Sequence, residues 1–183
     1  ESNEIEDSKE TINSLTEING EIEFKNVSFK YGEHLPLVLD NVSLKIPKGS
    51  TLAIMGFTGS GKTSFVNLIP RLYDALDGGV LIDGIDVRNI PLDLLRSNIG
   101  LVPQESFVIS DTVANNISYG LRETDKEKVI TVSKIAGFDK DVDSFPKGYD
   151  TIVGERGITF SGGQKQRASI ARSLAIDPKI VIL

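Results

Sequence analysis

The chain has 183 residues, of which 39% are hydrophobic and 25% are charged, which is ordinary for a soluble globular domain with its own core. Its formal net charge of −6 argues against a nucleic-acid-binding surface as the main function, and no apolar run approaches the ~18–20 residues needed to cross a bilayer. The absence of cysteine excludes disulfides and cysteine-based metal sites, and no signal peptide opens the chain.

The first part of the chain divides into an acidic segment and two strands. Residues 1–19 carry many acids and no apolar periodicity, which predicts a linker or solvated arm, so we expect the folded domain to span residues 20–183. Residues 21–29 alternate polar and apolar side chains and residues 37–46 form a second run, which predicts two strands. Tyr31 follows the first strand, where its ring could stack on an adenine base or simply pack at the strand end.

Residues 56–63, GFTGSGKT, fit the pattern G-x-x-x-x-G-K-[ST] of a phosphate-binding loop. Residues 50–55 before this loop predict a buried strand, and residues 64–69 after it predict a helix. Glycines let the backbone turn its N–H groups toward an anion, and the helix start adds a favourable dipole. Lys62 is then expected to reach the β/γ-phosphates of a nucleotide, and the Thr63 hydroxyl to ligate Mg²⁺.

The middle of the chain predicts packing elements and one isolated polar candidate. Residues 79–84 predict a strand and turn, 92–96 a short helix, and 99–103 another strand, after which Gln104 follows. Residues 111–117 begin like a capped helix. Residues 125–136 predict a helix with Val129, Val132 and Ile135 on one face.

The last third contains a second potential anion site. Residues 151–157 place two glycines around a charged pair, and Ser161 is a plausible N-cap for the basic, amphipathic helix that follows. A Ser-Gly-Gly helix start exposes N–H groups to an anion, although a flexible turn has the same composition. Residues 179–183 are an apolar β run.

From about residue 20 to the end, the chain resembles the nucleotide-binding domain of an ABC transporter, most like those of exporters. Residues 56–63 resemble the Walker A loop, residues 160–164 the ABC signature, and residues 180–183 the apolar half of Walker B. Gln104 resembles the Q-loop glutamine, Tyr31 the adenine-stacking aromatic, and residues 151–157 a stretch typical of exporters. The resemblance implies an α/β fold: a P-loop NTPase core (RecA-like) with an antiparallel β subdomain and an α-helical signature subdomain.

The resemblance also implies the functional roles. Lys62, Gln104 and Ser161 would be catalytic, with Thr63 and Gln104 as Mg²⁺ ligands. ATP would contact Tyr31, Gly56, Phe57, Thr58, Gly59, Ser60, Gly61, Lys62, Thr63, Ser64, Gln104, Ser161, Gly162, Gly163 and Gln164. Two such domains would close head to tail on ATP, as a homodimer or heterodimer, and the Gln104 loop with Glu155 and Arg156 would face the transmembrane domain at the cytoplasmic side of the membrane. Nucleic acid is not an expected partner.

Three departures from the family pattern affect the expected activity. Phe160 stands where the signature usually has leucine, and Lys165 replaces a common arginine or glutamine. The third is the absence after Leu183 of the Walker B aspartate, the catalytic glutamate and the switch histidine, so the C-terminal part of the core is expected to be missing. The 183 residues alone are therefore predicted to lack ATPase activity, whereas the complete protein would be an export ATPase. The alternatives are a regulatory, degenerate ATP-binding module of a heterodimeric transporter and a soluble ABC ATPase acting on DNA or ribosomes.

Overall fold

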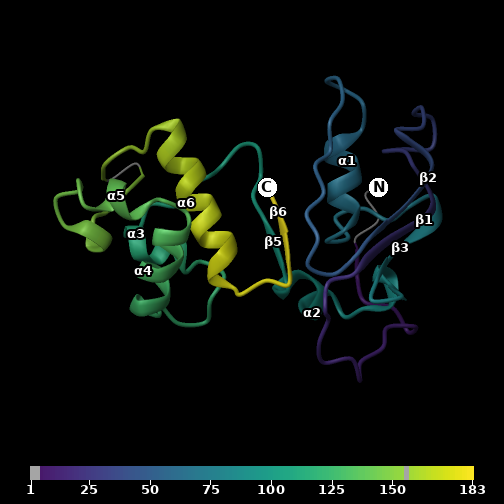
Figure 1. Cartoon of the computed structure of the whole chain (residues 1–183), viewed down its shortest axis with the longest axis horizontal. Helices are drawn as coiled ribbons and strands as arrows, with labels where there is room; N and C mark the ends of the chain where they lie inside the picture. The colour runs from purple at the N-terminus through teal and green to yellow at the C-terminus, as the bar shows by residue number, and fades with distance from the viewer. Residues whose placement is uncertain (1–4, 155–156) are drawn as a thin grey trace. The chain divides into compact units, whose positions relative to one another are not determined.

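The computed structural model describes residues 5–154 and 157–183, and the chain divides into two compact units, Glu1–Ser97 and Asn98–Leu183. Each unit has its own small sheet and its own helices (Figure 1). Among the described residues, no helix combines the length and the apolar character that a membrane crossing requires.

The first unit contains an antiparallel sheet with the strand order β2-β1-β3-β4. The strands are β1 (Ile22–Phe29), β2 (Leu39–Ile46), β3 (Asp77–Ile82) and β4 (Ile85–Asp86), which confirms the strands predicted near residues 21–29, 37–46 and 79–84. The β1 register shifts between Phe24 and Val27, where Asn26 has a φ of 49°. This bulge moves the buried side chains from even to odd positions, so Phe24 and Val27 both face the core.

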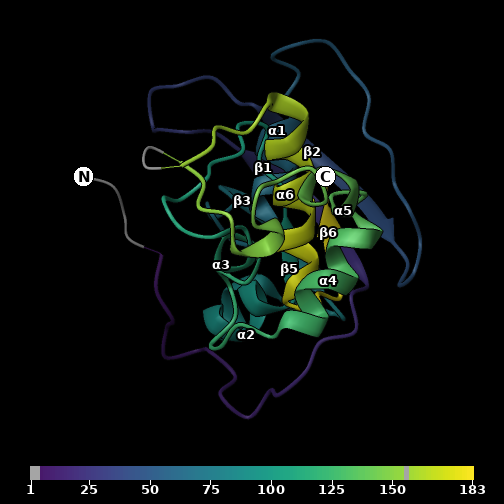
Figure 2. The ribbon, with the colours of Figure 1, turned by 90° about the vertical axis from the view of Figure 1, so that its left-hand side faces the viewer.

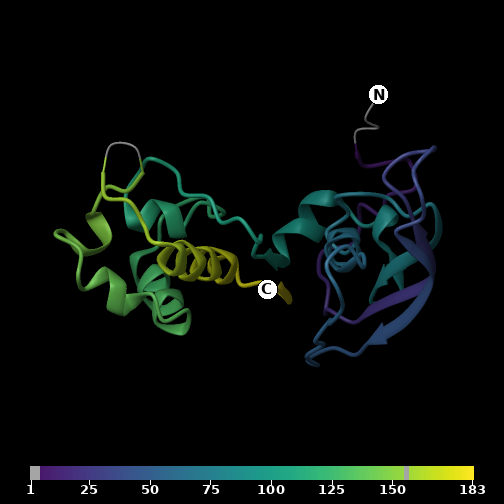
Figure 3. The same ribbon diagram turned by 90° about the horizontal axis from the view of Figure 1, so that it is seen from above.

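The helix after the phosphate-loop sequence packs against this sheet, as Figure 3 shows from above. Helix α1 (Lys62–Leu68) is seven residues long, and its Phe65 ring stacks on Phe24 of β1 with centroids 4.0 Å apart and planes 12° apart. Leu68, at the end of the helix, is 1% exposed. A 3₁₀ turn η1 (Val87–Asn89) and helix α2 (Leu92–Ser97) complete the unit.

The strand predicted for residues 50–55 is not formed, so that prediction was wrong. The segment has no helix or strand assignment, and Leu52, Ile54 and Met55 are 43%, 39% and 91% exposed. An apolar run becomes a buried strand only when neighbouring strands pair with it and a further layer covers it. Neither sheet of the described chain includes this segment, so it forms no ladder of backbone hydrogen bonds with a strand.

Part of the acidic N-terminal segment makes specific contacts with the first unit. Ile18 is 3% exposed and Thr11 is 7% exposed, and the Ile12 N–H donates to the carbonyl oxygen of Asn89 at 2.8 Å. The Asp83 carboxylate accepts from the backbone N–H groups of residues 19, 20 and 21. Residues 12 and 19, which lie in the segment 1–19 predicted as a linker or solvated arm, are therefore hydrogen-bonded to later parts of the first unit.

The second unit is mainly helical, with one parallel pair of strands, β5 (Ile99–Leu101) and β6 (Ile180–Ile182). Its helices are α3 (Val113–Ile117), α4 (Lys126–Ile135), α5 (Asp139–Val142) and α6 (Gly162–Ala175), with a 3₁₀ turn η2 (Gly148–Asp150). Helix α6 packs beside α3 and α4 (Figure 2). The rings of Phe138, Phe145 and Phe160 contact one another in the core, with centroids 5.5–6.2 Å apart.

The helical predictions for this unit are confirmed except for one side chain. Thr112 and Asp125 cap α3 and α4 through their side-chain oxygens, which confirms the capped start of the first helix. On α4, Val129 and Val132 are buried, but Ile135 is 69% exposed, so its predicted place on the same face was wrong. Six residues turn a helix by about 600°, which places Ile135 about 120° away from Val129.

Candidate nucleotide-binding site

The phosphate loop, residues 56–63, turns sharply at two of its glycines. Gly59 and Gly61 have φ angles of +82° and +87°, which are left-handed values that other residues adopt only under strain. At Gly61 a Cβ would lie 2.9 Å from the carbonyl oxygen of Val38, so both the backbone angle and the close approach of the next segment require glycine there. The loop is therefore a tight backbone turn that leads directly into α1.

The Lys62 ammonium lies inside the curve of this loop. It donates to the carbonyl oxygens of Gly56 at 2.8 Å and Phe57 at 2.9 Å, both from the opposite limb of the turn. Helix α1 begins at Lys62 with Gly61 as N-cap, and no side chain caps its N–H groups. A positive charge and uncapped N–H groups therefore share one concave turn, which is a favourable setting for an anion.

Thr63 and Ser64 follow the lysine in the first turn of α1 and differ in exposure. Thr63 is exposed, so its hydroxyl is accessible to a metal ion or a phosphate oxygen. Ser64 is 4% exposed, and its hydroxyl lies 2.7 Å from the phenolic oxygen of Tyr31. The structure thus brings Tyr31 to the phosphate-loop helix, although 33 residues separate Tyr31 from Ser64 in the sequence.

Tyr31 belongs to a small aromatic cluster on the same unit. Its ring meets Phe29 and Tyr73 in edge contacts, with centroids 4.9 Å and 5.2 Å apart. Tyr31 nevertheless remains 48% exposed. Two neighbouring rings and one hydrogen bond fix the orientation of this side chain, while much of it stays available for stacking on a planar base.

Gln104 lies in the second unit, in an exposed loop just beyond β5. The buried Asn116 side chain, which is 1% exposed, holds the later part of this loop. Its amide oxygen accepts from the Ile109 N–H at 2.9 Å, and its amide nitrogen donates to the Ile109 carbonyl at 3.0 Å. Five residues after Gln104, the loop is therefore anchored to α3.

Arg172 of α6 joins the same anchor. It donates to the Asn116 carbonyl at 2.7 Å and to the Phe107 carbonyl at 3.2 Å, and its guanidinium lies 4.5 Å from the centre of the Phe107 ring. Burial lowers the pKa of Arg172, and the neighbouring Tyr119 opposes that effect. The helix that begins at the signature segment is therefore tied to the loop that carries Gln104.

The signature segment, residues 160–164, forms the start of α6. The Ser161 hydroxyl oxygen accepts from the Gln164 N–H at 3.3 Å, and the Gln164 side chain accepts from the Ser161 N–H at 2.9 Å, which is a complete capping box. The prediction that Ser161 is an N-cap is confirmed. The Ser161 hydroxyl accepts the Gln164 N–H through its oxygen, so its proton is not used in that hydrogen bond. Gly162 and Gly163 are exposed.

Sequence reasoning missed the side chains that hold Gln164 in place. Its amide nitrogen donates to Asp141 at 3.3 Å, and the same carboxylate receives two hydrogen bonds from Arg167 at 2.7 and 3.0 Å. Hydrogen bonds from Arg167 hold the pKa of Asp141 below its ordinary value, against a smaller opposing effect of burial. Asp141 lies 23 residues before Gln164, on the short helix α5, and no local pattern in the sequence indicates this contact.

The candidate residues thus fall into two groups. Tyr31 and residues 56–64 come together in the first unit, whereas Gln104 and the signature segment belong to the second. Glu155 and Arg156, the charged pair predicted to face a membrane partner, lie outside the described residues. Within residues 5–154 and 157–183, no three His, Asp or Glu side chains gather as a metal site.

Comparisons with known proteins agree on one family. The ABC transporter family matches residues 39–183. A multidrug export ATP-binding/permease protein YgaD of Bacillus subtilis (strain 168), itself named as putative, is 45% identical over 167 residues, which is 91% of this chain and 29% of that protein. An ATP-dependent lipid A-core flippase of Desulfotalea psychrophila is 43% identical over 180 residues, which is 98% of this chain and 31% of the flippase.

A solved structure gives the same result. The structure of a bacterial Atm1-family ABC exporter with ATP bound matches with a TM-score of 0.84 and 38% identity, over 91% of this chain and 29% of that one. The chain therefore spans only about a third of the length of the relatives that it matches.

Proposed function

The chain belongs to the ABC transporter family and corresponds to part of an exporter nucleotide-binding domain, and from this premise we propose that residues 56–64 bind ATP with Mg²⁺. The observation that carries the proposal is the placement of the Lys62 ammonium within the phosphate loop, beside uncapped N–H groups at the start of α1. In this role Lys62 exchanges its two loop carbonyls for β- and γ-phosphate oxygens. Gly56, Phe57, Thr58, Gly59, Ser60 and Gly61 supply the backbone that surrounds the phosphates.

The remaining assignments concern the base and the metal ion. Tyr31 stacks on the adenine, supported by its hydrogen bond to Ser64 and its contacts with Phe29 and Tyr73. Mg²⁺ takes oxygen ligands, and the exposed Thr63 hydroxyl and the Gln104 amide oxygen have that chemistry. The metal ion would offset phosphate charge; the protein residues orient the triphosphate around it.

In the longer protein, we propose that the signature segment binds the γ-phosphate of a second nucleotide-binding domain. The capping box leaves the Ser161 proton free to donate, and the N–H groups of Gly162 and Gly163 are exposed beside it. ATP would then favour head-to-tail closure of two domains, and hydrolysis would remove the bridging phosphate. Closure would drive transport by a transmembrane domain at the cytoplasmic face of a membrane.

Calorimetric titration with Mg·ATP tests the binding proposal. We expect saturable binding to the chain and its loss in Lys62→Ala, because removal of the ammonium leaves the phosphates without their only cationic side chain in the loop. Lys25→Ala is the matched control, since Lys25 is exposed and pairs with Glu23 at 3.5 Å, away from the phosphate loop in the sequence. Equal affinity in Lys62→Ala and Lys25→Ala would refute the proposal.

A phosphate-release assay addresses hydrolysis separately. A polypeptide of these 183 residues is expected to bind ATP without turnover, because general-base groups contribute about 10²–10⁴-fold to such reactions and none of the residues proposed to contact ATP is a carboxylate or a histidine. Robust, Lys62-dependent phosphate release from this polypeptide would contradict that expectation. The same assay on the longer protein separates an active export ATPase from the regulatory, degenerate module.

A further inference from the structure

A cluster of arginines surrounds the far end of the phosphate-loop helix. Directly after α1, the chain passes through Pro70 and Arg71, and Arg71 adopts a left-handed φ of 52°. That conformation often ends helices, but glycine or asparagine usually occupies it because other residues are strained there. Arg71 is also only 6% exposed, so its surroundings must hold both its backbone and its charge.

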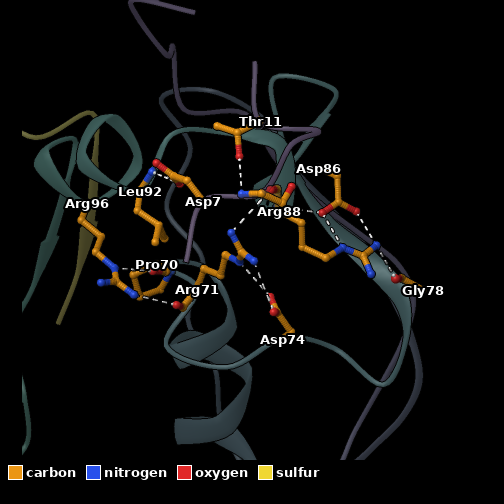
Figure 4. Close-up of polar contacts among 11 residues, drawn as sticks. Asp7, Thr11, Pro70, Arg71, Asp74, Gly78, Asp86, Arg88, Leu92 and Arg96 are labelled. Carbon is orange, nitrogen blue, oxygen red and sulfur yellow. Dashed lines mark hydrogen bonds and ion pairs between the residues drawn. The ribbon is translucent and has the colours of Figure 1, made fainter. Parts of the chain in front are cut away.

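Two sets of contacts hold this turn, as Figure 4 shows. The Arg71 guanidinium pairs with Asp74 at 2.9 Å and also donates to the carbonyl oxygen of Arg88. Arg96, from the last turn of α2, donates from Nε to the Pro70 carbonyl at 3.3 Å and from Nη2 to the Arg71 carbonyl at 2.9 Å. The exposed Arg96 guanidinium therefore binds the backbone carbonyls of the turn that follows α1.

Helix α1 is short enough for this contact to matter at its other end. Its seven residues span about 10 Å, with Lys62 and Thr63 in the first turn and the Arg96 contacts just past the last. A helix of this length moves as one rigid piece. Where Arg96 places the end of α1 therefore helps to determine where the Lys62 ammonium and the Thr63 hydroxyl lie.

Helix α2 is itself held by the N-terminal segment. The Asp7 carboxylate accepts from the Leu92 N–H at 3.0 Å, at the start of α2, and the Thr11 hydroxyl oxygen accepts from the Ser8 N–H at 2.9 Å (Figure 4). Hydrogen bonds that involve a charged group are the stronger ones, so Asp7 is an effective cap for the helix that carries Arg96. The contacts run continuously from Asp7 through α2 and Arg96 to the end of α1.

We propose that Arg96 is a positioning residue for the phosphate loop, and that the N-terminal segment acts on that loop through Asp7 and α2. This inference rests on the proposed function of residues 56–64 as an ATP site. Arg96 does not touch the nucleotide in this proposal. It sets the position of α1, and the docking of Asp7 sets the position of Arg96.

The test measures Mg·ATP affinity by calorimetry and the ³¹P chemical shift of the bound β-phosphate. Arg96→Gln is expected to weaken binding about two- to thirty-fold, the range found for residues that couple to a site without contacting it, and to move the β-phosphate shift. Arg96→Lys should recover part of the affinity, because an ammonium can still donate to the carbonyls of Pro70 and Arg71. Asp7→Ala should weaken binding in the same direction, but by less.

Two matched variants control for changes of charge and for general loss of stability. Arg88→Gln removes a neighbouring guanidinium that pairs with Asp86 at 2.7 Å and whose side chain does not bond to the α1 turn. Glu6→Ala removes an exposed carboxylate next to Asp7. Both are expected to bind Mg·ATP as the unchanged chain does. A purely structural role for Arg96 would lower the urea midpoint but leave the affinity and the β-phosphate shift of the folded protein unchanged.

The outcomes separate this inference from the function on which it rests. If the chain binds Mg·ATP in a Lys62-dependent way but folded Arg96→Gln binds equally well, or no worse than Arg88→Gln, the inference is wrong and the ATP site stands. If Arg96→Gln fails to fold, Arg96→Lys and Asp7→Ala decide in its place by the same measurements. If the unchanged chain shows no Lys62-dependent binding, the proposed function fails and the inference fails with it.

Discussion

Replacing Gly61 with alanine should damage the phosphate loop more than the same change at Gly59. Both glycines have left-handed φ angles, +87° and +82°, so alanine at either position costs about 1–2 kcal/mol of backbone strain. The two sites differ in their surroundings. Around Gly59 an added Cβ meets nothing within 4 Å, whereas at Gly61 it would lie 2.9 Å from the Val38 carbonyl oxygen and 3.1 Å from Leu39 Cδ2.

The extra cost at Gly61 comes from a neighbour that cannot easily move. The Val38 N–H donates to the Phe29 carbonyl at 2.8 Å, which ties this backbone to the end of β1. Overpacking of this kind typically costs about 1–3 kcal/mol, so Gly61→Ala should destabilise the native loop by about 2–5 kcal/mol in total. Gly59→Ala should destabilise the loop only by its backbone strain, about 1–2 kcal/mol.

The assay combines urea unfolding, followed by circular dichroism, with Mg·ATP calorimetry. If the loop keeps its shape, the Gly61→Ala penalty appears in the free energy of unfolding; if the loop rearranges instead, it appears as weaker ATP binding. Gly84→Ala, with a φ of +81° and open space around the site, measures the cost of strain alone outside the loop. Equal stability and equal affinity in Gly61→Ala and Gly59→Ala would refute the argument from close packing.

Substitutions at three further positions test the two units. Phe65→Ala should lower the free energy of unfolding by about 3–5 kcal/mol, because Phe65 is 7% exposed and stacks on Phe24, and a loss below 1 kcal/mol in urea unfolding would contradict this. Ser161→Ala should cost about 0.5–2 kcal/mol through the lost helix cap, whereas Ser161→Asp should keep the cap and the urea midpoint. Arg167 lowers the pKa of Asp141 in the folded state, so the pair stabilises the folded protein at pH values above the unfolded carboxyl pKa of about 3.9. This contribution to the free energy of unfolding is lost as the pH falls through the lower pKa of the native state. Asp141→Asn should therefore remove that part of the acid dependence in thermal melts at pH 2 to 7.

Local sequence was sufficient wherever a few adjacent residues determine the structure. The phosphate loop follows from its glycines and Lys62, since left-handed turns and a lysine at the helix start are encoded within eight residues. The capping role of Ser161 follows in the same way, because its partner Gln164 is three residues away. The alternating pattern of β1 also predicted a strand correctly, although not the bulge at Asn26.

Predictions failed where an element depends on a distant partner. Residues 50–55 have the composition of a buried strand but pair with no strand among the described residues, so they remain exposed and outside both sheets. The N-terminal segment has the composition of a solvated arm, yet Ile18 is buried and Asp7 caps α2, 85 residues away. The composition of a segment indicates its average affinity for water. It carries no information about the surface, formed by residues distant in the sequence, on which the segment can dock.

The sequence by itself determined the phosphate loop and the cap at the signature segment, because each depends on residues close together in the chain. It also determined the family, because several such short motifs follow one another in a fixed order along the chain. Only the tertiary structure decided that Tyr31 bonds to Ser64, that Arg172 ties α6 to the Gln104 loop, and that Arg96 closes the end of α1. Each of these contacts joins residues at least 25 positions apart. Such pairs form only after each unit has folded and brought their elements together, so no local pattern encodes them.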